Sequence, residues 1–375
     1  MEIQYSPKYA YLDVTDVTQV ENIINSFGFQ RICLVVDSGI KNQFLINLRE
    51  TLDNKFPFVS EYLNNSREPL TTDVDKLVDF LLTEDSDCLV VVGGGSTLDL
   101  AKAAAVVAKL GLKAIDFQGV DFKSRNKIFT FVIPTNAGSG AEATKSAVLF
   151  NPKTGIKRGI NNVMILPDAV ILCTPLLDGL PNRSFIAAIF DGFTHALESY
   201  IGNSSTLRTR ALSVEAMQIY ISQFLDIAKT EVVMHHPDIL KASFYAGSAI
   251  CNSETGPVHA ISYPLSEYLS YSHGEAISCA LVPVLKSYLE KNLAILEVLL
   301  EFEEINTVDE FFDLLLKVKE KYLLYPKVES VEIDVEKFAT RSLELKGAIQ
   351  NSPINWTHAD SVRAYEEIFL IRNSE

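Results

Sequence analysis

One aspartate and three histidines are the side chains of this sequence that could carry chemistry: Asp191, His195, His259 and His273. Imidazole nitrogens and a carboxylate oxygen are ligands for divalent metals such as Zn²⁺ and Fe²⁺. If the four side chains converge, they would hold such a metal and leave a coordination position open for a substrate. The sequence therefore predicts a metalloprotein.

The spacing of this set has two interpretations. Asp191 and His195 lie four residues apart in a segment with helical periodicity, so they share one helix face. An isolated pair of this kind is usually a solvated or capping pair, and a lone histidine in an apolar helix is more often a core residue than a ligand. Three histidines and a matching aspartate in largely uncharged surroundings favour the ligand interpretation.

A run of three glycines suggests a second site. Gly93, Gly94 and Gly95 join an apolar strand pattern to a helix pattern. Glycines let the backbone approach a bulky anion, and the helix N-terminus offers free N–H groups. We expect Ser96 to cap that helix, with Asp99 as its capping-box partner. The alternative is a plain strand-to-helix turn, and the run is not the G-x-G-x-x-G fingerprint of an ordinary Rossmann domain.

Two further features fit a nucleotide. The loop at 134–142, which contains Thr135, Asn136 and Ser139, follows the next strand, where small and hydroxylic residues suit ribose or phosphate. Alone it could be an ordinary polar loop. Asp37 ends the first strand, where a carboxylate can bind a ribose and would repel a 2′-phosphate, which favours NAD over NADP. The alternative is that Asp37 only starts a turn.

These side chains need elements that position them. In the first half, apolar strand patterns alternate with helical spacing, which is typical of a parallel sheet covered on both faces. We expect strands at 32–36, 88–92 and 128–133, and helices at 41–52, 74–82 and 97–109. After about residue 182 the helical period dominates, with helices expected at 183–201, 207–228, 237–252, 274–291, 308–322 and 359–371 and a connection at 323–336. The prediction is an α/β domain at 1–180 with a mostly parallel sheet, then an all-α domain at 181–375.

Composition limits the partners. The 375 residues carry a formal net charge of −15, which argues against nucleic acid and anionic membranes. No uncharged apolar run reaches about 18 residues, and the N-terminus lacks the pattern of a signal peptide. The five cysteines include no C-x-x-C pair, so we expect buried free thiols in a reducing cytoplasm.

With these motifs identified, the chain resembles the iron-containing (group III) alcohol dehydrogenases of the dehydroquinate-synthase-like superfamily. The resemblance covers nearly the whole length. It rests on four motifs in order: Gly93-Gly94-Gly95-Ser96-x-x-Asp99-x-x-Lys102, Pro134-Thr135-Asn136-Ala137-Gly138-Ser139-Gly140-Ala141-Glu142-Ala143-Thr144, Asp191-x-x-x-His195-Ala196-x-Glu198, and His259 to His273-Gly274. It implies an NAD(P)-binding α/β domain, a helical metal-binding and substrate domain, and a metal at the cleft between them.

The resemblance also implies site residues. The metal ligands would be Asp191, His195, His259 and His273, and the metal Fe²⁺ or Zn²⁺. The expected nucleotide site, for NAD rather than NADP, comprises Asp37, Gly94, Gly95, Ser96, Asp99, Thr135, Asn136, Ser139 and Lys157. Family members are often homodimers or larger oligomers.

One position departs from the family pattern. Many members carry a second histidine four residues after the third ligand, whereas this chain has Tyr263. A tyrosine hydroxyl could relay a proton, but its unperturbed pKa of about 10 makes it a poor base near neutral pH. Tyr263, after Ser262, resembles the branches that act on phosphonoacetaldehyde or on the C8 alcohol of an octulosonate sugar, which favours a polar or anionic substrate.

The expected reaction is hydride transfer between NAD(P) and a primary alcohol or aldehyde, with the metal as Lewis acid. Three alternatives stay open on the sequence alone. They are a dehydroquinate-synthase-like lyase that cycles NAD internally, a nucleotide- and metal-binding protein that has lost its activity, and an oxidase-like enzyme that passes electrons to another acceptor.

Overall fold

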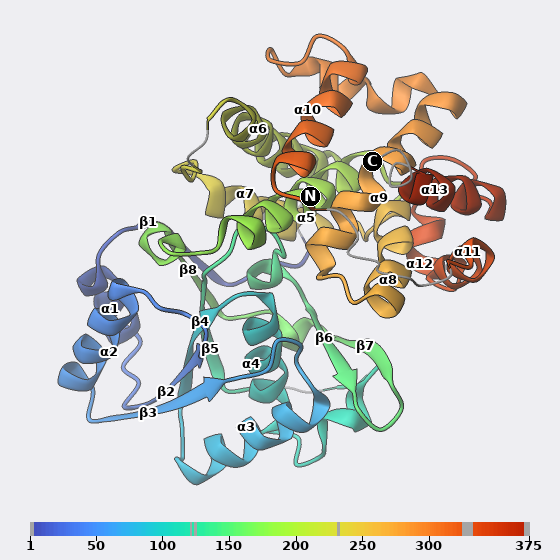
Figure 1. Cartoon of the computed structure of the whole chain (residues 1–375). Coiled ribbons are helices and arrows are strands. Elements are labelled where there is room, and N and C mark those ends of the chain that lie inside the picture. Colours follow the sequence, from blue (N-terminus) through green and yellow to red (C-terminus); the bar gives the residue numbers. More distant parts are fainter. Residues whose placement is uncertain (1–3, 121, 124–125, 231–232, 325–332, 371–375) are drawn as a thin grey trace. The chain divides into compact units, whose positions relative to one another are not determined.

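The computed structural model describes residues 4–120, 122–123, 126–230, 233–324 and 333–370. The chain divides into two compact units, Met1–Leu180 and Pro181–Glu375 (Figure 1). The division falls where the strand and helix patterns of the sequence give way to continuous helical periodicity. Among the described helices, none has both the length and the apolar character needed to span a lipid bilayer.

The first unit is built on a parallel sheet. Its elements are β1 (Tyr9–Val14), α1 (Val17–Asn25), β2 (Arg31–Asp37), α2 (Gln43–Lys55), β3 (Phe58–Asn64), α3 (Thr71–Thr83), β4 (Cys88–Gly93), α4 (Gly95–Val107), β5 (Phe129–Pro134), β6 (Ser146–Asn151), β7 (Ile156–Asn161) and β8 (Ala169–Cys173), with short 3₁₀ helices at Ala114–Phe117, Ala141–Ala143, Val163–Ile165 and Thr174–Leu177. Six strands pair in the order β1-β8-β5-β4-β2-β3, and every pairing is parallel. The predicted α/β fold with a mostly parallel sheet is confirmed.

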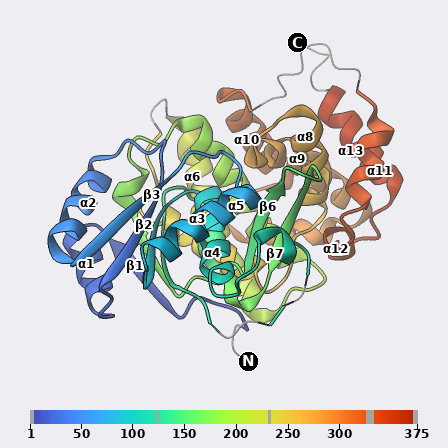
Figure 2. The same ribbon diagram turned by 90° about the horizontal axis from the view of Figure 1, so that it is seen from below.

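The central strands are buried because helices cover both faces. Alternate residues of β2 and β4, such as Leu34 and Val90, pack with Ile24 of α1 and Leu48 of α2 in one apolar cluster. α1 and α2 lie on one side of the sheet, and α3 and α4 lie on the other (Figure 2). Burial on both faces explains why these strands are continuous apolar runs.

The strand order contains a topological switch point. β2 and β4 are neighbours, but the chain continues from β2 to β3 on one side and from β4 to β5 on the other. Open α/β sheets bind ligands at the carboxyl ends of the strands at such a point. Asp37 ends β2, Gly93 ends β4 and Pro134 ends β5, so the predicted nucleotide residues other than Lys157 lie at or after the ends of three adjacent strands.

The sequence did not predict a separate hairpin in this unit. β6 and β7 pair antiparallel, from Ser146 opposite Asn161 to Asn151 opposite Ile156. Gly155 turns the chain before β7 with φ +70°, a conformation that glycine adopts without strain. Lys157 lies on this hairpin.

In the second unit, every described element is a helix. The helices are α5 (Asn182–Ile201), α6 (Leu207–Lys229), α7 (Ile239–Ile250), α8 (Pro257–Leu269), α9 (His273–Lys291), α10 (Val308–Lys321), α11 (Val335–Leu343), α12 (Lys346–Gln350) and α13 (His358–Leu370), with a 3₁₀ segment at Leu293–Glu301. The predicted all-α domain is confirmed, although α8, α11 and α12 were not predicted. Most of the expected connection at 323–336 lies outside the described residues, and α11 begins at its end.

α5 is the central helix of this unit. Most of its residues, including Asp191, His195 and Glu198, are buried, and it packs against α6, α7 and α9. A helix that is surrounded on all sides can place polar side chains out of contact with water. The charged residues of α5 therefore need partners within the unit.

Candidate metal centre and nucleotide site

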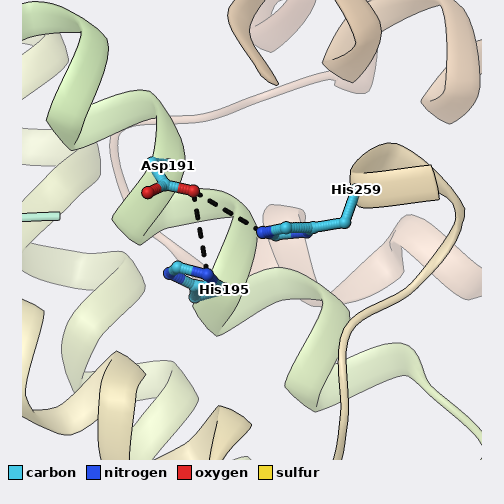
Figure 3. A group of neighbouring side chains, drawn as sticks. All are labelled: Asp191, His195 and His259. Carbon is cyan, nitrogen blue, oxygen red and sulfur yellow. Dashed lines mark ion pairs between the residues drawn. The ribbon is translucent and has the colours of Figure 1, made fainter. Parts of the chain in front are cut away.

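The four predicted ligands converge in the second unit. The Nε2 atoms of His195, His259 and His273 lie 3.7, 3.5 and 3.5 Å from the same atom, Oδ1 of Asp191. The ligand atoms of Asp191, His195 and His259 all lie within 4.8 Å of one another. Figure 3 shows Asp191 and His195 on one helix, with the ring of His259 approaching from another.

The distances fit a bound metal better than direct hydrogen bonds. Two ligand atoms that each lie about 2.1 Å from a tetrahedral metal are roughly 3.4 Å apart. The observed distances from the histidine nitrogens to Oδ1 of Asp191, 3.5–3.7 Å, are close to this value. Oδ1 of Asp191 and Nε2 of His259 are buried and have no hydrogen-bond partner among the described residues. A divalent cation would satisfy both atoms, so the residues present fit such an ion.

The charges of the cluster are strongly coupled. Burial raises the pKa of Asp191, but the surrounding imidazoles of His195, His273 and His259 outweigh burial and hold that pKa well below its usual range. Burial lowers the pKa of His259, but Glu198 and Asp191 outweigh it and raise that pKa to about 9. Without a metal, the site therefore holds protons that a cation would displace.

A close helix contact places His273, the fourth predicted ligand. α9 begins at His273, as predicted, after a capping box between Ser272 and Glu275. A Cβ atom on Gly274 would lie 2.3 Å from the carbonyl oxygen of Ala187 on α5. Only glycine lets α9 approach α5 this closely, and the approach carries His273 to Asp191. The His273 side chain is 38 % exposed, so this side of the cluster is accessible.

Close contacts explain two of the three glycines in the run of the first unit. A Cβ on Gly93 would lie 2.6 Å from Cβ of Thr97, and a Cβ on Gly95 would lie 2.9 Å from Oγ of Ser139. Gly94 faces open space, and no side chain of the described residues caps α4 there. The first N–H groups of α4 are therefore available to an anion such as a pyrophosphate.

The two predicted nucleotide loops meet at the sheet edge. The contact of Gly95 with Ser139 joins the loop after β4 to the loop after β5. Thr135 is buried, and its N–H donates to the carbonyl of Gly93. Oδ1 of Asn136 accepts the N–H of Ala137. The loops on adjacent strands thus form one polar edge.

One local prediction was wrong. Ser96 does not cap α4, because the helix begins at Gly95 with Gly94 as its N-cap. The Ser96 hydroxyl instead donates to the carbonyl of Arg67. Asp99 accepts the N–H of Val148 and lies 2.9 Å from Nζ of Lys102. These contacts give Asp99 a part in holding the neighbouring chain, and its contact with a nucleotide stays a prediction.

The remaining predicted nucleotide residues are polar and partly exposed. Oδ1 of Asp37 accepts the N–H of Gly39 at 2.8 Å, so this residue starts the turn that was considered as an alternative. Its other carboxylate oxygen could still contact a ribose. Lys157 forms a 2.5 Å ion pair with Glu68, and its contact with a nucleotide also stays a prediction.

Comparison with known families covers both units. The family model described as iron-containing alcohol dehydrogenase matches residues 7–174. The model of the C-terminal domain of the same family matches residues 185–369. The chain belongs to the iron-containing alcohol dehydrogenase family. Membership confirms the predicted enzyme class and, at the level of the family, NAD and a divalent metal as its cofactors.

The chain is similar to individual members of the family in sequence and in structure. The NAD-dependent methanol dehydrogenase of Bacillus methanolicus is 30 % identical over 266 residues, 69 % of this chain and 68 % of that protein. The sulfoacetaldehyde reductase of Bilophila wadsworthia is 31 % identical over 221 residues, 58 % of this chain and 57 % of that protein. A crystal structure of an iron-containing alcohol dehydrogenase superimposes with a TM-score of 0.82 at 27 % identity and covers 98 % of each chain.

Tyr263 is the residue that departs from the family pattern. It lies beside the metal cluster. It is half-buried on α8, four residues after His259. Its ring meets the ring of His273 edge-on, with the centroids 5.9 Å apart. Tyr263 can therefore shape the accessible side of the site.

Glu198, for which the sequence predicted no role, contacts the cluster in the structure. One oxygen of its buried carboxylate lies 2.6 Å from Nδ1 of His259. A signal existed, because Asp191, His195 and Glu198 are spaced i, i+4 and i+7 and so share one helix face. What the sequence could not show is which element that face meets.

The thiols are structural. Within the described residues all five cysteines are buried and free, as predicted. Burial raises the pKa of both the Cys33 and the Cys173 thiols to about 12. These thiols stay protonated at neutral pH and are poor metal ligands or nucleophiles.

Proposed function

We propose that this enzyme transfers hydride between NAD and a small polar or anionic primary alcohol or aldehyde. The proposal places a divalent metal on Asp191, His195, His259 and His273. The observation that carries it is the convergence of three imidazole nitrogens on one buried carboxylate oxygen. In this proposal residues 1–180 bind the nucleotide, and residues 181–375 bind the metal and the substrate.

The substrate class rests on two arguments. Tyr263 replaces an imidazole of the usual family pattern with a neutral phenol that can donate a hydrogen bond to an anionic or hydroxylated substrate. Among the relatives, a protein named for the sulfonate-bearing aldehyde sulfoacetaldehyde is 31 % identical. An aldehyde or alcohol with a sulfonate, phosphonate or carboxylate group is therefore the first class to test.

The chain's own residues have separate tasks in the reaction. A metal in this cluster would supply a Lewis acid that polarises the substrate oxygen, and NAD supplies the hydride chemistry. Asp191 contributes the negative charge that holds the cation, and the histidines contribute neutral nitrogens. Tyr263 lies where it can orient the substrate and pass a proton through its hydroxyl. The burial of Asp191 and His259 keeps water away from the inner side of the cluster.

The nucleotide preference is tested at Asp37. Its carboxylate ends β2, where it would repel the 2′-phosphate of NADP. We expect Asp37→Ser to lower the KM for NADP and to leave the metal content unchanged. Steady-state kinetics with both cofactors measure this effect. An unchanged ratio of kcat/KM for the two cofactors would show that another residue reads the ribose.

The metal ligands are tested with two histidine variants. His259→Ala should lose the metal and all turnover and should still bind NAD. His358 is the matched control, because it is half-exposed and pairs with Glu336 outside the cluster. Anaerobic purification with elemental analysis gives the metal content and decides between iron and zinc. If His259→Ala keeps its metal and its activity, the ligand assignment is wrong.

The substrate is tested with NADH absorbance. A panel of simple alkanols, sugar acids, and aldehydes bearing sulfonate or phosphonate groups should give the highest kcat/KM for an anionic member. Stoichiometric NADH change supports a dehydrogenase, whereas turnover without net NADH change supports internal cycling. Tight binding of NAD and metal without turnover on any class would favour a protein that has lost its activity.

Assembly and location are part of the same proposal. We expect a homodimer or larger oligomer in the cytoplasm. The buried free thiols fit a reducing compartment. Analytical ultracentrifugation of the metal-loaded enzyme measures the oligomeric state, and a monomer at micromolar concentration would contradict the expectation.

A further inference from the structure

Glu198 is a buried carboxylate beside the metal cluster with three hydrogen-bond contacts. It lies one helical turn after His195 on α5 and is only 2 % exposed. Its Oε1 accepts the N–H of Val258 at 2.7 Å, and its Oε2 accepts the N–H of Gly256, also at 2.7 Å. Oε2 also lies 2.6 Å from Nδ1 of His259. Three groups around the first turn of α8 therefore meet one carboxylate on α5.

This contact decides which nitrogen of His259 is available. An ionised carboxylate only accepts hydrogen bonds, so Nδ1 must carry the proton that it shares with Glu198. In a neutral imidazole the other nitrogen, Nε2, then holds the lone pair. Nε2 lies 3.5 Å from Oδ1 of Asp191, on the side where the cluster converges. The ring is thus set in the tautomer that binds a metal.

The same carboxylate fixes the position of α8. A Cβ atom on Gly256 would lie 2.7 Å from Oε1 of Glu198, so glycine is needed for the helix end to reach the carboxylate. Asn351 supports the loop before it by donating to the carbonyls of Glu254 and Thr255. Because Glu198 and two of the ligands lie on α5, the contact joins the α5 ligands to the α8 ligand.

We propose that Glu198 is a positioning residue of the metal centre, which holds His259 with Nδ1 protonated and Nε2 directed toward Asp191. The inference rests on the proposed metal function. Carboxylate partners of ligand histidines orient the ring and raise its basicity, and their loss typically weakens metal binding about 10–100-fold. A carboxylate that served only to cap α8 would not change the ring of His259.

The test compares two variants that each alter the support of α8. Glu198→Gln keeps the size of the side chain and replaces the carboxylate by a neutral amide. Tyr365→Phe is the matched control, because the Tyr365 hydroxyl donates to the carbonyl of Ile261 on the same helix, away from the His259 ring. Zinc affinity is measured by competition with a chromogenic chelator. The His259 Nδ1–H resonance is measured by NMR on the zinc-loaded chain with ¹⁵N-labelled histidine.

Glu198→Gln should weaken zinc binding about 10–100-fold and move the Nδ1–H resonance upfield, because an amide oxygen is a weaker acceptor than a carboxylate. Tyr365→Phe should keep the zinc affinity and the resonance of the parent. The inference is overturned if Glu198→Gln keeps both, or if Tyr365→Phe loses as much affinity.

Two further variants separate the possible failures. If Glu198→Gln does not fold, Gly256→Ala tests the same contact, since its methyl group displaces the carboxylate while the charge stays. Unchanged zinc affinity in a folded Gly256→Ala protein overturns the inference. His259→Ala separates the inference from the proposed function. If His259→Ala loses zinc while Glu198→Gln keeps it, only the role of Glu198 fails. If His259→Ala keeps zinc, the metal site itself fails.

Discussion

At the residue scale, the proposed metal ligands would bind protons and a metal ion in competition. Asp191 stays ionised because the imidazoles around it lower its pKa. His259, between Asp191 and Glu198, has its pKa raised to about 9. At neutral pH the metal-free cluster therefore holds a proton on His259, and a cation must displace it before Nε2 can bind.

This competition predicts the pH dependence of metal binding. Below about pH 9 the apparent zinc affinity should fall about tenfold per pH unit, because one proton must leave His259 for each ion bound. The unfolding free energy of the metal-free chain depends on pH in the opposite direction, since it decreases as the pH rises. Protonation of His259 stabilises the fold fully below its unfolded pKa of about 6.5, and this contribution is lost as the pH rises through about 9. Chelator competition and urea unfolding from pH 6.5 to 9.5 measure both. Zinc affinity independent of pH would show that His259 is not protonated in the metal-free site.

Whether the sequence could predict the position of a single site residue depended on the type of that residue. The four predicted ligands were singled out because histidine and aspartate have few roles in apolar surroundings, and the structure brings them together. Glu198 was not singled out, because a glutamate on a helix is normally solvated, and its partners are backbone N–H groups that no motif reveals. For Asp99 the prediction of a capping box failed, because α4 begins at Gly95 and leaves that carboxylate to meet Lys102 and Val148.

At the scale of elements, the contact between α9 and α5 supports the fourth ligand. Gly274→Ala places a methyl group against the carbonyl of Ala187 and should move the first turn of α9 away from α5. We expect a loss of about 1–3 kcal/mol in unfolding free energy and weaker zinc binding, because His273 moves away from Asp191. Urea unfolding and chelator competition measure these effects.

Gly347 is the matched control for this substitution. It lies in α12, and a Cβ there would meet nothing within 4 Å. Gly347→Ala should keep the zinc affinity and leave stability unchanged or raised by up to about 1 kcal/mol. Equal zinc affinity in the Gly274→Ala and Gly347→Ala proteins would show that the close helix contact does not position His273.

A buried lysine holds the second nucleotide loop. Nζ of Lys102 on α4 donates to the carbonyls of Ala141 and Ser146, each at 2.7 Å, and pairs with Asp99. Lys102→Met should cost about 3–5 kcal/mol, because it leaves the carboxylate of Asp99 without its cation. It should also weaken NAD binding, because the loop that ends at Ala141 loses its anchor.

The chain offers a comparable pair on its surface. Lys76 forms a 2.8 Å pair with Asp73 at the same i,i+3 spacing, but its side chain is 68 % exposed. Lys76→Met should lower the unfolding free energy much less than Lys102→Met, because an exposed ion pair is screened by water. Urea unfolding and fluorescence titration with NADH compare the two variants. Equal losses would mean that burial of Lys102 does not set its contribution.

The central strands β2, β4 and β5 and most of the long helices were predictable, whereas α8 was not. The runs that became β2, β4 and β5 are short and apolar, and the long helices keep one apolar period. α8 carries Pro257 at its start and Pro264 inside, and a proline inside a helical pattern normally marks its end. His259 was therefore predicted as a ligand without the helix that carries it.

At the scale of the whole molecule, the two kinds of site lie in different units. Asp191, His195, His259 and His273 all belong to residues 181–375, and the predicted nucleotide residues all belong to 1–180. The polar motifs of residues 1–180 therefore predict only nucleotide binding, and those of residues 181–375 predict only metal binding. This division could be read from the change in periodicity, whereas the arrangement of side chains within each unit could not.

This separation predicts how each unit responds to its ligand. A ligand that binds only the folded state protects the elements that hold it. Removal of the metal should speed amide hydrogen exchange in α5, α8 and the first turn of α9 and leave β4 and β5 unchanged. Addition of NAD should slow exchange after β4 and β5. Mass spectrometry of peptic peptides measures both. Faster exchange confined to β4 and β5 after metal removal would contradict the ligand assignment.

α5 carries two of the predicted metal ligands and the carboxylate that supports a third within little more than two helical turns. Asp191, His195 and Glu198 lie within eight residues of one helix, and each residue adds about 100° of rotation. A single amino acid inserted between Asp191 and His195 would turn His195 and Glu198 to another side of the helix together. An insertion or deletion here would therefore disrupt the proposed metal ligands and their supporting carboxylate in one event.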